Sequence, residues 1–243
     1  MTALKKLSIC VACIVALPAT VCSQTKGFVE GTTRIFGGNE RMNTYGLAIG
    51  YELVPTYTFS LRANGSRKDS ITGNGFVLNH GGYDYEFLVR HVLTAQPKVD
   101  VALGLSSPDT ADRNRRIFGT YDIGWTEQLC PTTTLRFGAK GILGPDPLAA
   151  IGFRLVSRTA KGSQAFAQLY VPTQGDNTRS VTTGQGQRGA IYSLGMEWED
   201  GGTSSQMFYG LALTNALGAT TGTSITPALG GQPGIKFTIG FRF

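Results

Sequence analysis

The last ten residues, Gly234 to Phe243, read GIKFTIGFRF and alternate apolar with small, polar or basic residues. Successive side chains of a β-strand point to opposite faces, so this stretch is predicted to be a strand with one wholly apolar face. Chain ends usually fray in water. A terminal strand this apolar therefore raises the question of which solvent it meets.

The same alternation recurs along the chain. It is clearest at 45–53, where YGLAIGYEL places Tyr45, Leu47, Ile49, Tyr51 and Leu53 on one face. Stretches 57–63, 83–90, 99–105 and 190–198 repeat it, and weaker cases lie at 28–36, 117–125, 134–141, 150–157, 164–171 and 205–214. With the terminal stretch these predict about twelve strands. No helical period competes after the first 23 residues.

Composition supports fine alternation of apolar and polar residues. Charged residues make up 16% of the chain, below the ~25% usual for soluble domains, and 33 of 243 residues are glycine. Mean hydropathy is −0.03. A helical membrane protein needs runs of ~20 apolar residues, which this mature chain lacks.

The first 23 residues form a predicted secretory signal peptide. Lys5 and Lys6 precede an apolar run over 7–17, Pro18 follows, and small residues lead to Ser23. Cleavage there leaves 24–243 as one domain, and an uncleaved anchor or a lipidated Cys22 are the alternatives. Cys130 is then the single remaining cysteine, which excludes a disulfide within the chain and a cysteine metal site.

The predicted connections alternate in length. Short turns lie at 54–55, 94–97, 127–132, 158–162 and 199–203, and longer polar links lie at 37–44, 65–81, 106–116, 172–188 and 215–233. Only 142–148 breaks the pattern. This alternation is typical of a closed antiparallel transmembrane β-barrel, an up-and-down meander whose short turns and termini face the periplasm. A secreted β-sandwich is the competing fold, but its polar face should carry many charges, whereas this one is rich in glycine and alanine.

Aromatic residues fall near the predicted strand ends in the apolar phase. Such girdles mark the two membrane interfaces of a barrel. The predicted girdle residues are Tyr45, Tyr51, Tyr57, Tyr83, Trp125 and Trp198.

The chain resembles the superfamily of bacterial outer-membrane β-barrels through its signal peptide, its loop alternation and its final strand ending in Phe243. The resemblance implies an outer-membrane location, surrounded by outer-membrane lipid. It also implies that the barrel-assembly machinery reads the C-terminal strand, with Phe241 and Phe243 as the signal. It carries over no functional residues. The net charge of +6 is scattered, so no nucleic-acid partner is expected.

The opposite phase should line the lumen. It carries seven acidic and eight basic residues, including those predicted to line a solute path: Arg62, Glu86, Arg90, Arg136, Arg154 and Glu197. Charged linings tune selectivity in pores, but acids and bases can also pair and fill the lumen. The first hypothesis is therefore a porin-like passive channel for small polar solutes. The second, motivated by the links 65–81, 172–188 and 215–233, is a non-conducting structural, adhesive or export-associated barrel.

Enzymatic function is the least favoured hypothesis. A barrel-embedded lipid hydrolase needs a base beside a nucleophile at the extracellular rim, but His91 falls near the periplasmic end and His80 lies in a loop. GQGQRG at 184–189 fits a dinucleotide fingerprint only formally, because a strand follows it where a helix is required. The sequence predicts no catalytic residue, cofactor or metal site.

Overall fold

The structure is a computed structural model that describes residues 26–36, 42–68, 83–107, 117–144, 147–160, 162–179, 185–200, 206–228 and 231–243. The predicted signal peptide lies outside these residues. The barrel strands are β1 (Lys26–Phe36), β2 (Met42–Val54), β3 (Tyr57–Lys68), β4 (Tyr83–Ala95), β5 (Lys98–Ser107), β6 (Phe118–Cys130), β7 (Thr133–Leu143), β8 (Leu148–Ala160), β9 (Ser163–Gln174), β12 (Ile191–Glu199), β13 (Gln206–Thr214) and β14 (Gly234–Arg242).

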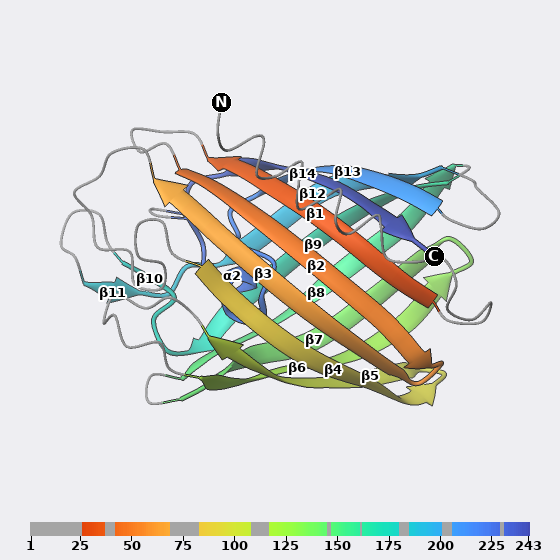
Figure 1. Ribbon diagram of the computed structural model, residues 1–243, viewed down its shortest axis with the longest axis horizontal. Helices are drawn as coiled ribbons and strands as arrows, with labels where there is room; N and C mark the ends of the chain where they lie inside the picture. Colours follow the sequence, from red (N-terminus) through yellow and green to blue (C-terminus); the bar gives the residue numbers. More distant parts are fainter. Residues whose placement is uncertain are drawn as a thin grey trace.

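These twelve strands form one closed barrel in which neighbours along the chain pair antiparallel (Figure 1). The predicted closed meander of about twelve strands is confirmed. A small separate sheet pairs β10 (Thr178–Arg179) with β11 (Gly186–Gln187) between β9 and β12. One short helix, α2 (Thr221–Ser224), lies between β13 and β14. No helix in the described part of the chain is long and apolar enough to cross a membrane.

The connections at the two ends of the barrel differ in length. Four of the five at one end, which also holds the first and last strand ends, have two residues and the fifth has six, whereas those at the other end have four to nineteen. We call these the short-turn end and the long-loop end. The predicted turn at 127–132 is too wide: β6 runs to Cys130, because Thr126 to Gln128 continue the ladder with β7. The turn is therefore Pro131 and Thr132 alone.

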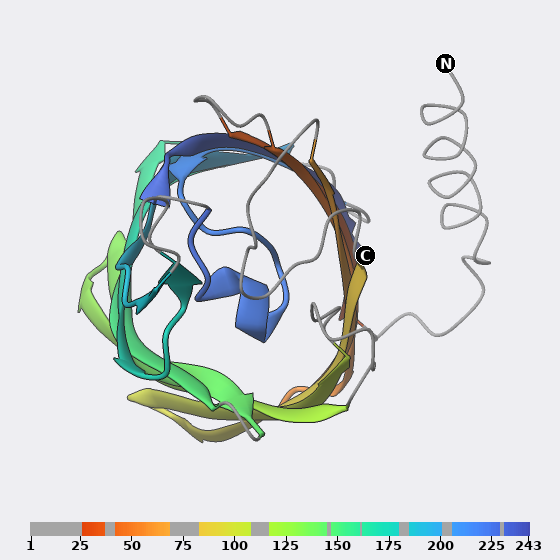
Figure 2. The ribbon, with the colours of Figure 1, turned by 90° about the vertical axis from the view of Figure 1, so that its left-hand side faces the viewer.

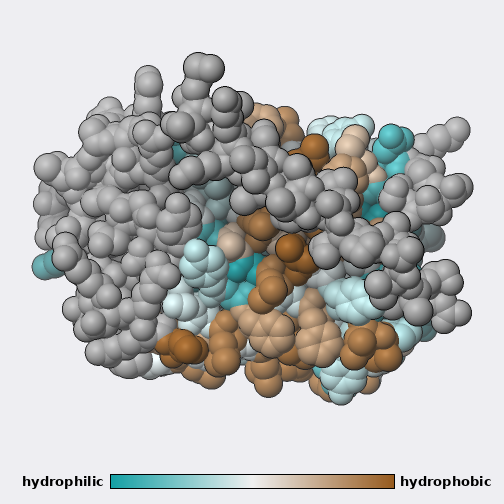
Figure 3. Space-filling view, viewed as in Figure 1, coloured by the Kyte–Doolittle hydropathy of each residue, from teal (hydrophilic) through white to brown (hydrophobic). Residues whose placement is uncertain are grey.

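The strands present two different faces. In β5, Leu103 and Leu105 are exposed on the outside, whereas Ala102 and Ser106 are buried on the inside. In Figure 3, hydrophobic side chains gather across the outer strand wall. An exposed apolar belt around a polar interior is the arrangement found in barrels surrounded by lipid.

The chain end closes the barrel. β14 pairs with β1 over nine residues, from Phe28 opposite Arg242 to Phe36 opposite Gly234. Beyond this ladder Gly27 and Phe243 exchange both backbone hydrogen bonds, 2.7 and 3.0 Å long. The terminal strand has a partner on each side, so it has no free edge that could fray.

Gly27 leaves room for the terminal ring, and this contact gives a first prediction. A Cβ at Gly27 would lie 2.6 Å from the Phe243 ring, whereas a Cβ at Gly31 on the same strand would meet nothing nearer than 3.9 Å. We expect Gly27→Val to displace the ring and lower unfolding stability by about 1–3 kcal/mol, the usual cost of overpacking. Urea unfolding in lipid vesicles measures this. Gly31→Val is the control, and equal stability of the two variants would contradict the prediction.

Candidate functional site

The six residues predicted to line the lumen all belong to the inward phase of their strands. Arg62, Glu86 and Arg90 come from β3 and β4, Arg136 and Arg154 from β7 and β8, and Glu197 from β12. Their neighbours along the strands, such as Leu61, Phe87 and Phe153, are exposed on the outer surface. The structure brings these six into three groups with different surroundings.

The first group is an ion network on the wall formed by β4 to β7. Arg136 Nη2 lies 3.0 Å from Asp100 Oδ1 and 2.9 Å from Asp122 Oδ1, and Arg90 Nη2 lies 3.0 Å from Asp122 Oδ2. Arg90 also donates to Asp100. Gly124 lies directly beneath the Arg136 guanidinium, where any Cβ would collide with it. Each arginine therefore contacts both aspartates, and the network is neutral.

The second group joins β8 and β12 across the lumen wall. Arg154 Nη2 lies 3.5 Å from Glu197 Oε1, and Gln164 donates a 2.7 Å hydrogen bond to Glu197 Oε2. The Arg154 guanidinium lies 5.0 Å from the centre of the Phe166 ring. Its Nε atom is buried and has no hydrogen-bond partner among the described residues. Arg154 is thus less completely paired than Arg90 and Arg136.

The third group binds a segment of the chain that enters the barrel. Residues 215–228, here called the inner segment, follow β13, and nearly all of them are buried. Figure 2, seen from the long-loop end, shows this blue segment with α2 inside the ring of strands. The predicted outer polar link at 215–233 is therefore wrong for residues 215–228.

Two carboxylates of β4 bind the start of α2. The Thr220 hydroxyl donates to Asp84, which also accepts a 3.0 Å bond from Ser106. The Thr221 N–H donates a 3.0 Å bond to Glu86 Oε2. Both carboxylates are 1% exposed. Their burial is stabilised by these charge-assisted hydrogen bonds, which are stronger than neutral ones.

Other strands bind the inner segment from further around the barrel. Arg62 Nη1 donates to the Ala219 carbonyl at 3.3 Å and lies 3.6 Å from Glu86 Oε2. Lys140 on β7 donates a 2.9 Å bond to the Ser224 hydroxyl. The Asn177 side chain, just after β9, donates a 2.9 Å bond to the Ile225 carbonyl. The segment is thus held to several walls at once.

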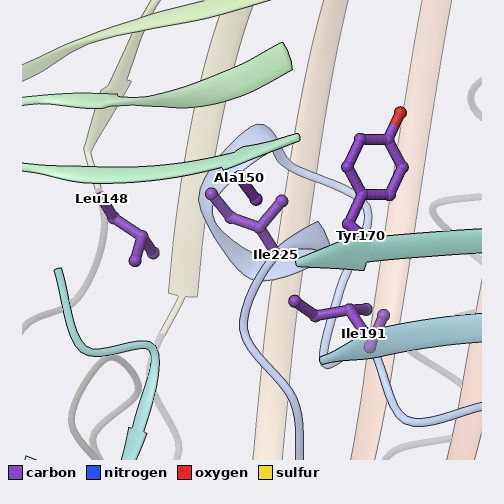
Figure 4. Close-up of a cluster of buried hydrophobic side chains, with 6 residues drawn as sticks. Leu148, Ala150, Tyr170, Ile191 and Ile225 are labelled. Carbon is purple, nitrogen blue, oxygen red and sulfur yellow. The ribbon is translucent and has the colours of Figure 1, made fainter. Parts of the chain in front are cut away.

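Apolar packing holds the two arms of the inner segment, which are the stretches 215–219 before α2 and 225–228 after it. Ala216 and Ile225 pack with Leu148, Ala150, Tyr170 and Ile191 of the wall in a buried cluster (Figure 4). A smaller cluster joins Leu217 and Ala228 of the arms to Phe36 of β1. Ala216 and Pro227 also pair as an isolated bridge, which brings the arms side by side.

The width of the barrel shows how much of the lumen the inner segment occupies. Twelve strands about 4.8 Å apart and tilted by about 40° enclose a backbone radius of roughly 12 Å. Inward side chains occupy about 5 Å on each side, half the usual spacing of packed sheets. The remaining width of roughly 14 Å is close to the 10–12 Å diameter of a helix with its side chains. The inner segment therefore fills most of the cross-section at its depth.

One composition signal could have revealed the inner segment. The stretch 215–233 contains no Asp, Glu, Lys or Arg, whereas each of the links 65–81, 106–116 and 172–188 contains several. A long connection exposed to water is rarely free of charge, and lysine and glutamate are almost never fully buried without a partner. The sequence prediction counted the stretch among the longer polar links and missed this contrast.

The predicted girdle residues take varied positions. Tyr45 is exposed near the long-loop end, and Tyr57 begins β3 and stacks on His91 at 4.1 Å. Trp198 lies one residue before the end of β12 and stacks on Tyr209, while Tyr51 lies three residues before the end of β2. Trp125 is exposed but lies five residues inside β6, because that strand is longer than predicted. The side chain of Tyr83 lies outside the described residues.

The structure describes one of the two histidines that were considered as catalytic bases. His91 Nδ1 donates a 3.2 Å hydrogen bond to the Thr56 carbonyl at the short-turn end, while His80 lies outside the described residues. Among the residues described, no three His, Cys, Asp or Glu side chains are grouped to hold a metal ion. Of the stretch 184–189, Gly186 and Gln187 form strand β11.

Known proteins resemble this chain in fold. No protein-family model matches it, and no curated protein sequence matches it. The NanC porin superposes with a TM-score of 0.53 at 10% identity, covering 89% of this chain and 98% of the porin. An outer-membrane channel from Pseudomonas putida F1 also gives 0.53, at 12% identity, over 93% and 98% of the two chains. The chain therefore has the fold of bacterial outer-membrane barrels.

Proposed function

We propose that this protein is an outer-membrane channel for small polar solutes, closed in the described conformation by its own inner segment. One observation carries the proposal. The side chains of Arg62, Arg90, Arg136 and Arg154 point into the barrel, yet 19–38% of their surface remains exposed. An interior that served only as packing would bury them.

The attachment of the inner segment also supports a channel. One backbone hydrogen bond, from the Asn215 N–H to the Tyr192 carbonyl, joins the start of the segment to β12. The other described contacts with the wall are hydrogen bonds that involve a side chain and two small apolar clusters. Such an element can leave the lumen without breaking any barrel ladder. The two similar folds are described as a porin and a channel, which agrees with this proposal.

Ion conduction in planar lipid bilayers tests the proposal. We expect low conductance with occasional openings from the natural mature chain. A chain whose inner segment is replaced by a short linker should conduct steadily. If both proteins are folded and neither conducts at any voltage, the channel proposal is wrong.

A non-conducting barrel is the second candidate. The neutral network of Arg90, Arg136, Asp100 and Asp122 and the buried inner segment both favour it, since charged walls can be paired and filled for stability alone. The same bilayer measurement separates the two candidates. The proposal that the barrel-assembly machinery reads Phe241 and Phe243 holds for either.

Placement in a membrane leads to a depth-dependent prediction. Leu103 is exposed in the middle of β5, whereas Leu53 is exposed one residue before the short-turn end of β2. Arginine on the lipid face costs about 2–4 kcal/mol at the bilayer midplane and about 0–1 near the interface. We expect Leu103→Arg to lower stability in lipid vesicles by the larger amount and Leu53→Arg by the smaller. Equal effects on urea unfolding would contradict a lipid-facing surface.

A further inference from the structure

Basic residues gather at one depth of the lumen. Arg34, Arg62, Lys140, Arg154 and Lys236, here called the basic belt, face inward five to eight residues from the short-turn end of their strands, as do Arg90 and Asp122 of the ion network. The sequence count of seven acids to eight bases concealed this grouping. The carboxylates that contact or interact with the belt are Glu30, Glu86 and Glu197, together with Asp122 of the ion network.

Two pairs of like charges stand directly opposite each other in the ladders. Arg34 faces Lys236 between β1 and β14, and Arg136 faces Arg154 between β7 and β8. Opposite residues on one face have Cβ atoms about 4.5–5.5 Å apart, and like charges at that distance are destabilising. Asp100 and Asp122 compensate Arg136. The other three bases of these two pairs, Arg34, Lys236 and Arg154, share the carboxylates of Glu30 and Glu197.

Compensation within the belt is incomplete. Lys140 donates to the Ser224 hydroxyl and lies 4.0 Å from the centre of the Tyr170 ring, both uncharged. The carboxylate that attracts it, Asp122, is already bound by Arg90 and Arg136. Within the described residues, the Lys236 ammonium has no hydrogen bond or ion pair. The belt therefore has more positive charge than its neighbours neutralise.

Arg154 lies at the centre of this excess. It interacts electrostatically with both Lys140 and Lys236, which come from different parts of the wall. Its side chain is 38% exposed, compared with 23% for Arg62, which also forms an ion pair. Its Nε is buried, but its Nη2 contact with Glu197 is long, at 3.5 Å, and the exposed part of the guanidinium faces the lumen. The guanidinium fork matches two oxygens of a carboxylate or phosphate group.

We propose that Arg154, with Lys140 and Lys236, forms a binding site for the oxyanion group of small solutes, a carboxylate or a phosphate, on the short-turn side of the inner segment. This inference rests on the proposed channel and names its solute class. The charges select anions, and the arginine fork favours oxyanions over chloride.

Calorimetric titration of the folded mature protein in detergent tests the site, with succinate and inorganic phosphate as probes and glycerol as the neutral comparison. We expect both anions to bind and glycerol not to bind. Arg154→Gln should weaken anion binding about tenfold or more, as loss of a charge-assisted hydrogen bond implies. Arg154→Lys, which keeps the charge and loses the fork, should fall between.

Arg158→Gln is the matched control, because Arg158 is exposed on the same strand, four residues nearer the short turn. Binding that is absent in the natural protein, or equal in Arg154→Gln and Arg158→Gln, overturns the site. Binding by only one probe assigns the site to carboxylates or to phosphates.

Reversal potentials in a salt gradient, measured with the inner segment replaced, separate this inference from the channel proposal. Anion selectivity that falls in Arg154→Gln supports both. Conductance without anion selectivity and without anion binding would overturn the binding site but would leave the channel proposal intact. Binding without conductance supports the site in a barrel that does not conduct.

Discussion

Replacing residues 216–227 with a short glycine–serine linker is expected to turn a nearly closed barrel into a steady pore, with conductance rising severalfold. The inner segment fills most of the width left by the wall side chains. Its removal also frees Asp84, Glu86 and Lys140 from their bonds to Thr220, Thr221 and Ser224. These charged groups would then be hydrated, and a water-filled, charged lumen conducts ions.

The closed ladder should survive this replacement. The inner segment contributes no strand to the barrel, and β13 and β14 remain paired from Gln206–Arg242 to Thr214–Gly234. The control places the same linker in the connection 200–205 at the short-turn end, which should leave conductance low. A folded variant that conducts no better than this control would show that the wall side chains close the lumen by themselves.

Substitution of one residue that binds the inner segment gives a finer test in the same bilayer measurement. Glu86→Gln keeps the shape of the side chain but removes the charge that accepts from the Thr221 N–H. More frequent openings without a larger open conductance are expected, because the segment is held less tightly while the wall is unchanged.

Arg136→Ala is expected to cost about 3 kcal/mol of unfolding stability, the lower part of the range for removing one partner of a buried ion pair. The loss leaves Arg90 as the one ion-pair partner of Asp100 and Asp122 among the described residues. It also empties the space above Gly124, which the guanidinium fills. Partial exposure of Arg136 in the lumen keeps the expected value at the lower end.

Urea unfolding in lipid vesicles measures this cost. Arg158→Ala, at an exposed position of β8, should change stability by about 0.5 kcal/mol or less. Combining Arg136→Ala with Asp122→Asn should cost less than the two single changes together, because they remove the same interaction. Full additivity would show that Arg136 acts through packing alone.

Much of the fold could be predicted from local pattern. Alternation in stretches such as 45–53 and 234–243 assigned each side chain to a face, because the period of a strand is two and depends on no distant residue. The length of β6 was underestimated. Residues 126–128 do not alternate strongly, and they extend the strand because β7 pairs with them.

The candidate site could be predicted less well. The inward phase of Arg62, Glu86, Arg90, Arg136, Arg154 and Glu197 follows from their strands. Their partners do not, since Arg136 meets Asp100 across 36 positions and Thr220 meets Asp84 across 136. These pairings depend on which strands become neighbours and on where the inner segment enters the barrel, which no local pattern encodes.

The sequence by itself determined a closed antiparallel barrel with an apolar outer face, because strand period and turn spacing are properties of neighbouring residues. The tertiary structure alone decided that residues 215–228 lie inside the barrel and which bases and carboxylates meet in the lumen. Both depend on the distance between residues on opposite walls, which exists only once twelve strands have closed into a ring.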